Sequence, residues 1–199
     1  MGVVGGEHIE MNIENSYGFD EQLIASNGII QSCEVSDILR ARLPGCVSVR
    51  KTSPDLDRRG VDWIAGLANG RTVGVDVKSR TIDYAARGND DLALETFSVI
   101  STKPGWTRDP TKLCEWVLWL WSDTGRFCLM PFPPLCGVFQ ANWQEWSKIY
   151  RRSVQRTPES ATRPDWRSEC VFVPRQVVID SVVDWCNGTI EQEFSPHGR

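Results

Sequence analysis

Two runs of residues that favour β-strands flank an Asn-Gly pair in the first half of the chain. The first run spans residues 61–67, the second spans residues 71–78, and Asn69-Gly70 lies between them. This dipeptide accepts the positive φ angles of a tight turn, so the pattern predicts a β-hairpin with a two-residue loop. The hairpin carries charged side chains within otherwise apolar strands, and such charges need a structural or functional reason.

The charged residues of this hairpin are Asp62 in the first strand and Asp76 and Lys78 in the second. Side chains alternate between the two faces of a strand, so Asp76 and Lys78 project from the same face. A two-residue loop pairs Trp63 with Asp76 and therefore places Asp62 on the opposite face. A bulge, an irregular start of the strand at residues 60–61 or a longer turn would bring the two acids together.

The rest of the pattern predicts one α/β domain over residues 1–199, with a central mixed β-sheet flanked by helices. Its core covers about residues 34–150, and residues 1–16 form a flexible or edge-pairing arm. Residues 116–121 are continuously apolar, which is typical of a strand buried on both faces. Helices are expected at 34–42 and 134–150, weak helical character at 18–30, further strands at 46–50 and 126–131, and loops at 53–59 and 153–165. Residues 92–100 fit a helix or a strand, and residues 170–179 carry strand signals interrupted by Pro174.

Composition excludes several classes of enzyme and of site. The chain has only two histidines, His8 and His197, each near one end, which argues against catalytic triads and histidine-based nucleases. Its seven cysteines are dispersed without a CxxC pair, so we expect reduced thiols and no zinc site. No signal-peptide pattern occurs and the longest apolar run has only six residues, so the expectation is a soluble, cytoplasmic protein without a membrane segment.

The sequence around the acids resembles a known family. Gly60-Val61-Asp62-Trp63-Ile64, followed by Val75-Asp76-Val77-Lys78-Ser79-Arg80, is similar to the core of the PD-(D/E)XK nuclease superfamily, which includes restriction endonucleases, archaeal Holliday-junction resolvases and phage exonucleases. The order of that core, a helix, a strand, the hairpin with the acids, then a helix and a strand, is similar to residues 34–121. Val61 stands at the proline position of the motif. The resemblance implies a restriction-endonuclease-like core.

The resemblance also implies an activity, namely divalent-metal-dependent hydrolysis of DNA phosphodiester bonds. Asp62 and Asp76 would bind Mg²⁺ or Mn²⁺, with the backbone carbonyl of Val77 as a further ligand, because these cations prefer oxygen donors. The metal would polarise the phosphate and lower the pKa of a bound water, while Lys78 would position that water and offset developing charge. No small-molecule cofactor is expected.

Two glutamates are further candidates. Many members of the superfamily carry a glutamate on the helix before the hairpin, and Glu34 matches that position best, with Glu21 as the second choice. The alternative explanation of Glu34 is an acid that interacts favourably with the N-terminus of its helix. Glu95 is the one acid within residues 92–100. It is either a metal ligand or a partner for Arg80 or Lys103.

Charge is unevenly distributed along the chain. All the charged residues in 1–37 are acidic, so the remainder of the chain is net basic although the whole carries −4. The basic stretch 148–167 is either a path for a phosphate backbone or a solvated loop. Trp106 follows Pro104-Gly105 and could stack on an unpaired base or cover the core. The expected contacts to DNA are Arg80, Arg87, Lys103, Arg108, Arg151 and Arg152.

These features predict a phage or bacterial accessory nuclease that acts on DNA in the bacterial cytoplasm. Two alternatives remain open at this point. The fold could be a catalytically inactive module that binds DNA or a protein partner, or it could be a ribonuclease. The pattern leaves open whether the enzyme acts from an end or internally, which sequence or branch it prefers, and whether it forms homo-oligomers.

Overall fold

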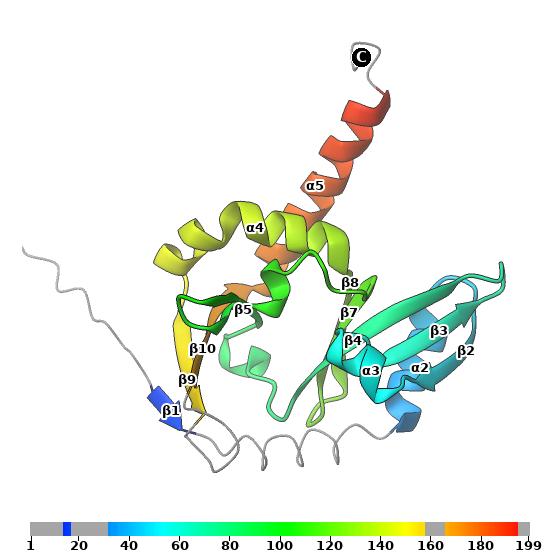
Figure 1. Cartoon of the computed structure of the whole chain (residues 1–199), viewed down its shortest axis with the longest axis horizontal. Coiled ribbons are helices and arrows are strands. Elements are labelled where there is room, and N and C mark those ends of the chain that lie inside the picture. Colours follow the sequence, from blue (N-terminus) through cyan, green and yellow to red (C-terminus); the bar gives the residue numbers. More distant parts are fainter. Residues whose placement is uncertain (1–13, 17–31, 158–165, 195–199) are drawn as a thin grey trace, which may run out of the picture.

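The computed structural model describes residues 14–16, 32–157 and 166–194. Over these ranges the chain is an α/β protein with two five-stranded sheets (Figure 1). One sheet has the strand order β2-β3-β4-β7-β8, and the other has the order β1-β9-β10-β5-β6. The expected mixed sheet is therefore present, but the second sheet was not predicted.

The mixed sheet consists of strands at predicted positions. Its members are β2 (Cys46–Lys51), β3 (Trp63–Leu67), β4 (Thr72–Arg80), β7 (Trp116–Trp121) and β8 (Arg126–Pro131). β2, β3 and β4 pair antiparallel, β7 lies parallel to β4, and β8 returns antiparallel to β7. The hairpin that carries the acids therefore supplies two of the three inner strands.

The second sheet combines segments that are far apart in the sequence. It consists of β1 (Glu14–Ser16), β5 (Asp91–Val99), β6 (Lys103–Pro104), β9 (Arg152–Thr157) and β10 (Trp166–Pro174). β1 pairs parallel to β9, and the other pairs are antiparallel. Residues 92–100 are thus almost entirely strand. The predicted loop at 153–165 is wrong for residues 153–157, which hydrogen-bond to β10, and its remainder lies outside the described residues.

The helices agree with the prediction in part. The expected helices correspond to α2 (Ser32–Arg42) and α4 (Phe132–Ile149), whereas the expected loop at 53–59 contains the short helix α3 (Pro54–Arg58). At Pro174 strand β10 ends and a long helix, α5 (Arg175–Phe194), begins. The interrupted strand pattern of residues 170–179 is therefore the end of a strand followed by the start of a helix. Two short 3₁₀ helices, η1 (Ala85–Arg87) and η2 (Trp106–Arg108), complete the described elements.

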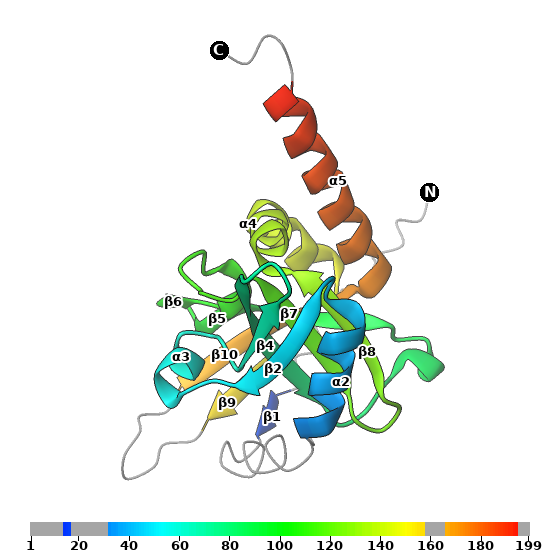
Figure 2. The ribbon, with the colours of Figure 1, turned by 90° about the vertical axis from the view of Figure 1, so that its right-hand side faces the viewer.

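The two faces of the mixed sheet have different neighbours. On one face, Val35 and Leu39 of α2 share a buried cluster with Val75 and Val77 of β4. On the other face, Trp119 of β7 joins a larger cluster formed with α4, α5, β5 and β10. Figures 1 and 2 show α4 lying over both sheets and α5 projecting away from them. Because side chains alternate along β4, the even-numbered residues of this strand face the second sheet.

The connection between β4 and β7 differs from the expected core. A helix was predicted there by the resemblance, but the segment instead forms β5, β6 and the two 3₁₀ helices. Leu92 and Leu94 of β5 are fully buried, and β5 pairs along its length with β10. Pairing and burial thus favour a strand. Among the described residues, no helix is both long and apolar enough to cross a membrane.

Candidate active site on the β3–β4 hairpin

The turn of the hairpin is one residue longer than predicted. The Leu67 N–H donates to the Arg71 carbonyl at 2.8 Å, and the Gly70 N–H donates to the Leu67 carbonyl at 2.9 Å, which leaves a three-residue loop at 68–70. Gly70 has φ +83°, whereas Asn69 is not left-handed. The Asn69 side chain instead accepts a hydrogen bond from the Arg71 N–H at 3.0 Å. This arrangement is a type I turn with a glycine bulge, a common three-residue hairpin loop.

The longer loop changes which residues face each other. Trp63 pairs with Val75, where the two-residue loop had paired it with Asp76. Asp62 precedes the paired residues of β3, and its N–H donates at 2.9 Å to the carbonyl of Val75, the partner of Trp63, so the strand begins irregularly here. The Asp62 carboxylate accepts from the Val77 N–H, between Asp76 and Lys78, and the charges of both of these residues act on it. The longer turn and an irregular start of the strand, two of the three irregularities considered above, therefore bring the Asp62 carboxylate close to Asp76 and Lys78.

Asp76 and Lys78 form a largely buried ion pair on this face. Asp76 is only 3% exposed, and the Lys78 Nζ lies 2.8 Å from its Oδ2. The same ammonium lies 4.6 Å from the centre of the Trp106 ring. Burial alone would lower the pKa of Lys78, but the adjacent Asp76 carboxylate raises it above its ordinary value, with smaller contributions from Asp62 and Glu95. Lys78 is therefore a cation at neutral pH.

Asp62 is held differently. Its Oδ2 accepts a hydrogen bond from the Val77 N–H at 2.7 Å. Burial, the charge of Asp76 and a side-chain hydrogen bond with Asp57 raise the pKa of Asp62 to about 8. Without an added cation, Asp62 is therefore mainly protonated at neutral pH. With both acids ionised, their two negative charges would exceed the single positive charge of Lys78.

Asp57 was missed by the sequence reasoning. It lies on α3, within a segment that was expected to be a loop, and α3 ends shortly before Asp62, which precedes β3. Hydrogen bonds from the Gly60 N–H to the Asp57 carbonyl (2.8 Å) and from the Val61 N–H to the Leu56 carbonyl (3.0 Å) join the two segments. The Ser-Pro-Asp sequence at residues 53–55, a common helix start, was the available signal.

Glu95 lies near Lys78 but has its own partners. Its Oε2 accepts hydrogen bonds from the Trp106 N–H at 2.8 Å and from the Ser98 hydroxyl at 2.9 Å. Neither of the expected partners, Arg80 or Lys103, is among these contacts. The carboxylate therefore fixes the backbone at Trp106, and its charge also acts on Lys78.

Glu34 does not join this group. It lies on α2, whose neighbours Val35 and Leu39 pack on the opposite face of the mixed sheet. Its carboxylate is close to Gly125, in the turn between β7 and β8, where a Cβ would lie 3.6 Å from the Glu34 Oε1. The proposed role of Glu34 in catalysis is therefore not supported by its position. Glu21, the second choice, lies outside the described residues.

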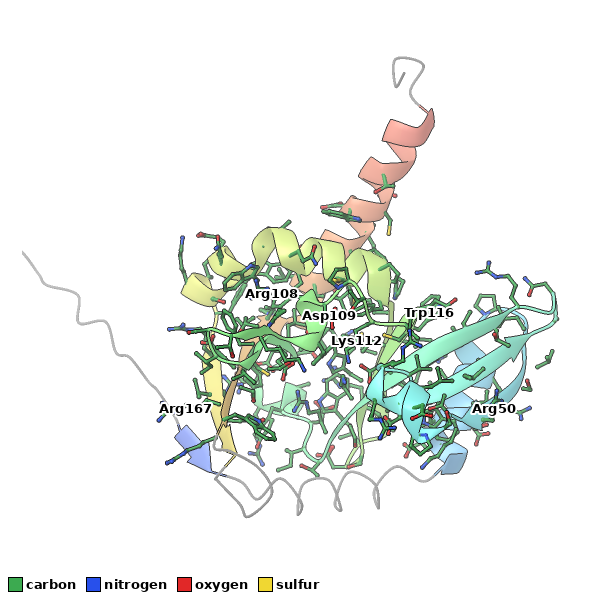
Figure 3. All side chains as sticks on the ribbon, in the orientation of Figure 1. Arg50, Arg108, Asp109, Lys112, Trp116 and Arg167 are labelled. Atoms are coloured by element: carbon green, nitrogen blue, oxygen red, sulfur yellow. The ribbon has the colours of Figure 1, made fainter. Side chains whose placement is uncertain are left out.

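The expected contacts to DNA occupy different environments. Arg80 follows Asp76 and Lys78 on the same face of β4, and its charge lowers the pKa of Asp91, although burial raises that pKa overall. Arg108 is half-buried, lies 3.9 Å from the centre of the Trp143 ring and donates to the Thr96 carbonyl at 3.0 Å. Arg108 is thus a structural residue, and Figure 3 shows it beneath α4.

The other four cations lie at the surface. Arg151 and Arg152 are paired with Asp91 at 3.6 Å and with Glu169 at 3.2 Å, respectively. Lys103 and Arg87 are exposed, and Arg87 lies over the ring of Tyr84. Figure 3 shows basic residues at opposite sides of the molecule, Arg50 near β2 and Arg167 on β10. Of the six expected contacts, Arg80 is the one aligned with the candidate site.

The donor set limits which cation could bind. The described residues contain no group of three or more His, Cys, Asp or Glu side chains arranged to hold a metal ion. Asp62 and Asp76 are two hard oxygen donors, which suit Mg²⁺ or Mn²⁺ and require water or backbone oxygen to complete the coordination. Comparisons of the chain with protein-family models, with curated proteins and with solved structures found no match.

Proposed function

We propose that this chain is a divalent-metal-dependent nuclease that hydrolyses DNA through Asp62, Asp76 and Lys78. The observation that carries the proposal is the Asp76–Lys78 ion pair, with Asp62 near enough for both charges to act on its carboxyl group. Two carboxylates that can hold a divalent cation beside an ammonium suit metal-assisted phosphodiester hydrolysis. A nuclease of this kind would act in a bacterial or phage-infected cytoplasm.

The order of elements also supports a core like that of the PD-(D/E)XK superfamily. Helix α2, strand β2 and the β3–β4 hairpin follow one another, and β7 then lies parallel to β4. The connection before β7 departs from the expected helix. We therefore propose a restriction-endonuclease-like core in which strands β5 and β6 occupy the place of that helix.

The candidate metal ligands fit a hard divalent cation. Asp62 has a raised pKa because burial and Asp76 disfavour its charge, so a cation between the two acids would relieve this cost. We propose Asp62 and Asp76 as the side-chain ligands and the Val77 carbonyl as a backbone ligand. When bound, Mg²⁺ or Mn²⁺ would polarise the phosphate and lower the pKa of water.

Lys78 has two roles in this proposal. Its ammonium stays charged because Asp76 is adjacent, so it can donate hydrogen bonds to an attacking water or to a phosphate oxygen. It also offsets the negative charge that develops on the phosphate during attack. Arg80, two residues further along the same face, would contact the neighbouring phosphate.

The test is cleavage by the full chain with Mg²⁺, with Mn²⁺ or with EDTA, on duplex, single-stranded and branched DNA and on RNA. We expect metal-dependent cleavage of DNA, reduced about a hundredfold or more by Lys78→Met. Lys148→Met is the matched control, because Lys148 is an exposed lysine that pairs with Glu145 on α4. At saturating DNA it should cleave like the native chain.

Three results would contradict the proposal. Cleavage of RNA alone would replace it by a ribonuclease. DNA binding without cleavage under any of these conditions would indicate an inactive binding module. Equal activity of Lys78→Met and the native chain would exclude the site itself.

A further inference from the structure

We propose that Trp106 is a positioning residue that holds the Lys78 ammonium against Asp76. This inference rests on the proposed nuclease function and extends it to a residue outside the hairpin. The Lys78 Nζ lies between two groups, the Asp76 Oδ2 at 2.8 Å and the Trp106 ring centre at 4.6 Å. An ammonium is attracted to the face of an indole ring, so both contacts favour the same position.

The Trp106 ring is fixed by other aromatic side chains. It is stacked on Phe132 of α4 with ring centres 6.2 Å apart and an interplanar angle of 29°. It also contacts Trp119 of β7 at 6.0 Å, and Trp119 is fully buried and pairs with Lys78 in the sheet. Because its neighbours belong to the core, the half-buried indole cannot turn outward without breaking these contacts.

The backbone of the same segment is fixed on β5. The Gly105 N–H donates to the Thr96 carbonyl at 3.1 Å, and the Trp106 N–H donates to the Glu95 carboxylate at 2.8 Å. In return, the Glu95 N–H donates to the hydroxyl of Thr107, which is fully buried, at 3.0 Å. A side chain at Gly105 would overlap the Glu95 carbonyl oxygen, so the segment lies directly on the strand.

This geometry favours positioning of Lys78 over stacking on a nucleic-acid base. A base would need an exposed indole face, but Trp106 is half-buried and contacts Phe132, Trp119 and Lys78. Lysine has four rotatable side-chain bonds, and restricting them before the reaction removes part of the entropic cost of orienting the ammonium. A positioning residue should therefore change the chemical step more than substrate binding.

The first measurement concerns the contact itself. The chain has five lysines, so protein labelled with ¹³C at the lysine Cε should give five resolved signals, assigned through Lys78→Arg. The indole ring current should shift the Lys78 ε-protons upfield. This shift should vanish in Trp106→Leu and persist in part in Trp106→Phe.

The second measurement concerns cleavage. Trp106→Leu should lower kcat about tenfold, which is about 1.4 kcal/mol, with KM within about twofold of native. Trp106→Phe, which keeps an aromatic face, should recover most of the loss. Trp143→Leu is the matched control, because Trp143 is also half-buried in this core but carries Arg108 on its ring instead of Lys78. It should leave kcat and the Lys78 signal unchanged.

The outcomes separate this inference from the proposed function. A raised KM with native kcat in Trp106→Leu would overturn it in favour of base stacking. Equal losses in Trp143→Leu and Trp106→Leu would also overturn it, because core packing alone would then explain the effect. If the native chain cleaves no substrate, the proposed function fails and the catalytic meaning of Trp106 fails with it, whereas the proton shift still decides whether the contact exists.

Discussion

The substitution Asp62→Asn should make the metal-free protein more stable at alkaline pH, although it should abolish cleavage. Burial, Asp76 and the hydrogen bond with Asp57 raise the pKa of Asp62 to about 8 from an ordinary value of 3.8. The unfolded chain releases this proton near pH 4, whereas the folded chain keeps it until about pH 8. The contribution of Asp62 to stability is therefore complete below about pH 4 and is lost as pH rises through about 8.

The size of the change in stability follows from the difference between the ordinary and the raised pKa of Asp62. Each pH unit between the two values corresponds to about 1.4 kcal/mol, so the upper limit at high pH is near 6 kcal/mol. Water reaches the half-buried Asp62, so we expect Asp62→Asn to raise the free energy of unfolding by about 2 kcal/mol near pH 9. The amide oxygen can still accept the hydrogen bond from the Val77 N–H. Near pH 4 the variant and the native chain should be about equally stable.

The free energies of unfolding of the native chain and of Asp62→Asn are measured by urea unfolding, followed by tryptophan fluorescence, in EDTA at about pH 4, 7 and 9. Asp55→Asn is the control, because the Asp55 side chain is 85% exposed and the variant keeps Asp62, so it should lose stability toward pH 9 as the native chain does. Added Mg²⁺ should stabilise the native chain and not Asp62→Asn, since only the native chain offers both ligands. A variant that is less stable than native at pH 9 in EDTA would refute the reasoning about this acid pair.

Three further predictions concern neighbouring contacts. Arg126 lowers the pKa of Asp83 to about 2, so the free energy of unfolding should fall as pH drops from about 4 through about 2. Asp83→Asn should make this fall smaller by about 1–2 kcal/mol, measured by urea unfolding at about pH 5 and at about pH 2.5. Glu95→Gln should keep cleavage within about tenfold of native, because its amide oxygen can still accept from the Trp106 N–H, whereas complete loss in a cleavage assay would identify a metal ligand. Gly105→Ala should lower the free energy of unfolding, measured in urea, by about 2 kcal/mol, because its Cβ would overlap the Glu95 carbonyl oxygen. Gly188→Ala is the control: its Cβ meets nothing within 4 Å, so it should be neutral or stabilising by about 0.5–1 kcal/mol.

The hairpin shows how far local patterns determine the candidate site. Alternation alone correctly predicts that Asp76 and Lys78 share a face, because that depends on one strand. The position of Asp62 depends on the loop length, and a change of one residue moves a side chain to the other face. Asn69-Gly70 is compatible with two-residue and three-residue loops, and the side-chain hydrogen bond of Asn69 belongs to the longer one. The sequence therefore predicts the hairpin but not its register.

The second sheet was beyond local reasoning for a different reason. Its central pair joins β5 to β10, and Thr96 contacts Glu169, which lies 73 residues away in the sequence. A register shift in this pair leaves Leu94 and Phe97 on the same face, which obscures the alternation that would otherwise indicate a strand. The apolar pattern of residues 92–100 therefore fits a helix as well as a strand until β10 is known.

The same connection explains why the candidate site depends on more than the hairpin. Parallel strands such as β4 and β7 need a crossover, and here the crossover leaves the mixed sheet, adds β5 to the second sheet and returns through Trp106. Because β5 pairs with β10, the position of Trp106 over Lys78 depends on a strand near the C-terminal end of the described chain. Residues 34–121, the part similar to the nuclease core, hold the acids, Lys78 and Trp106 but not β10. The hairpin supplies the charged groups, and the second sheet fixes the position of the indole beside them.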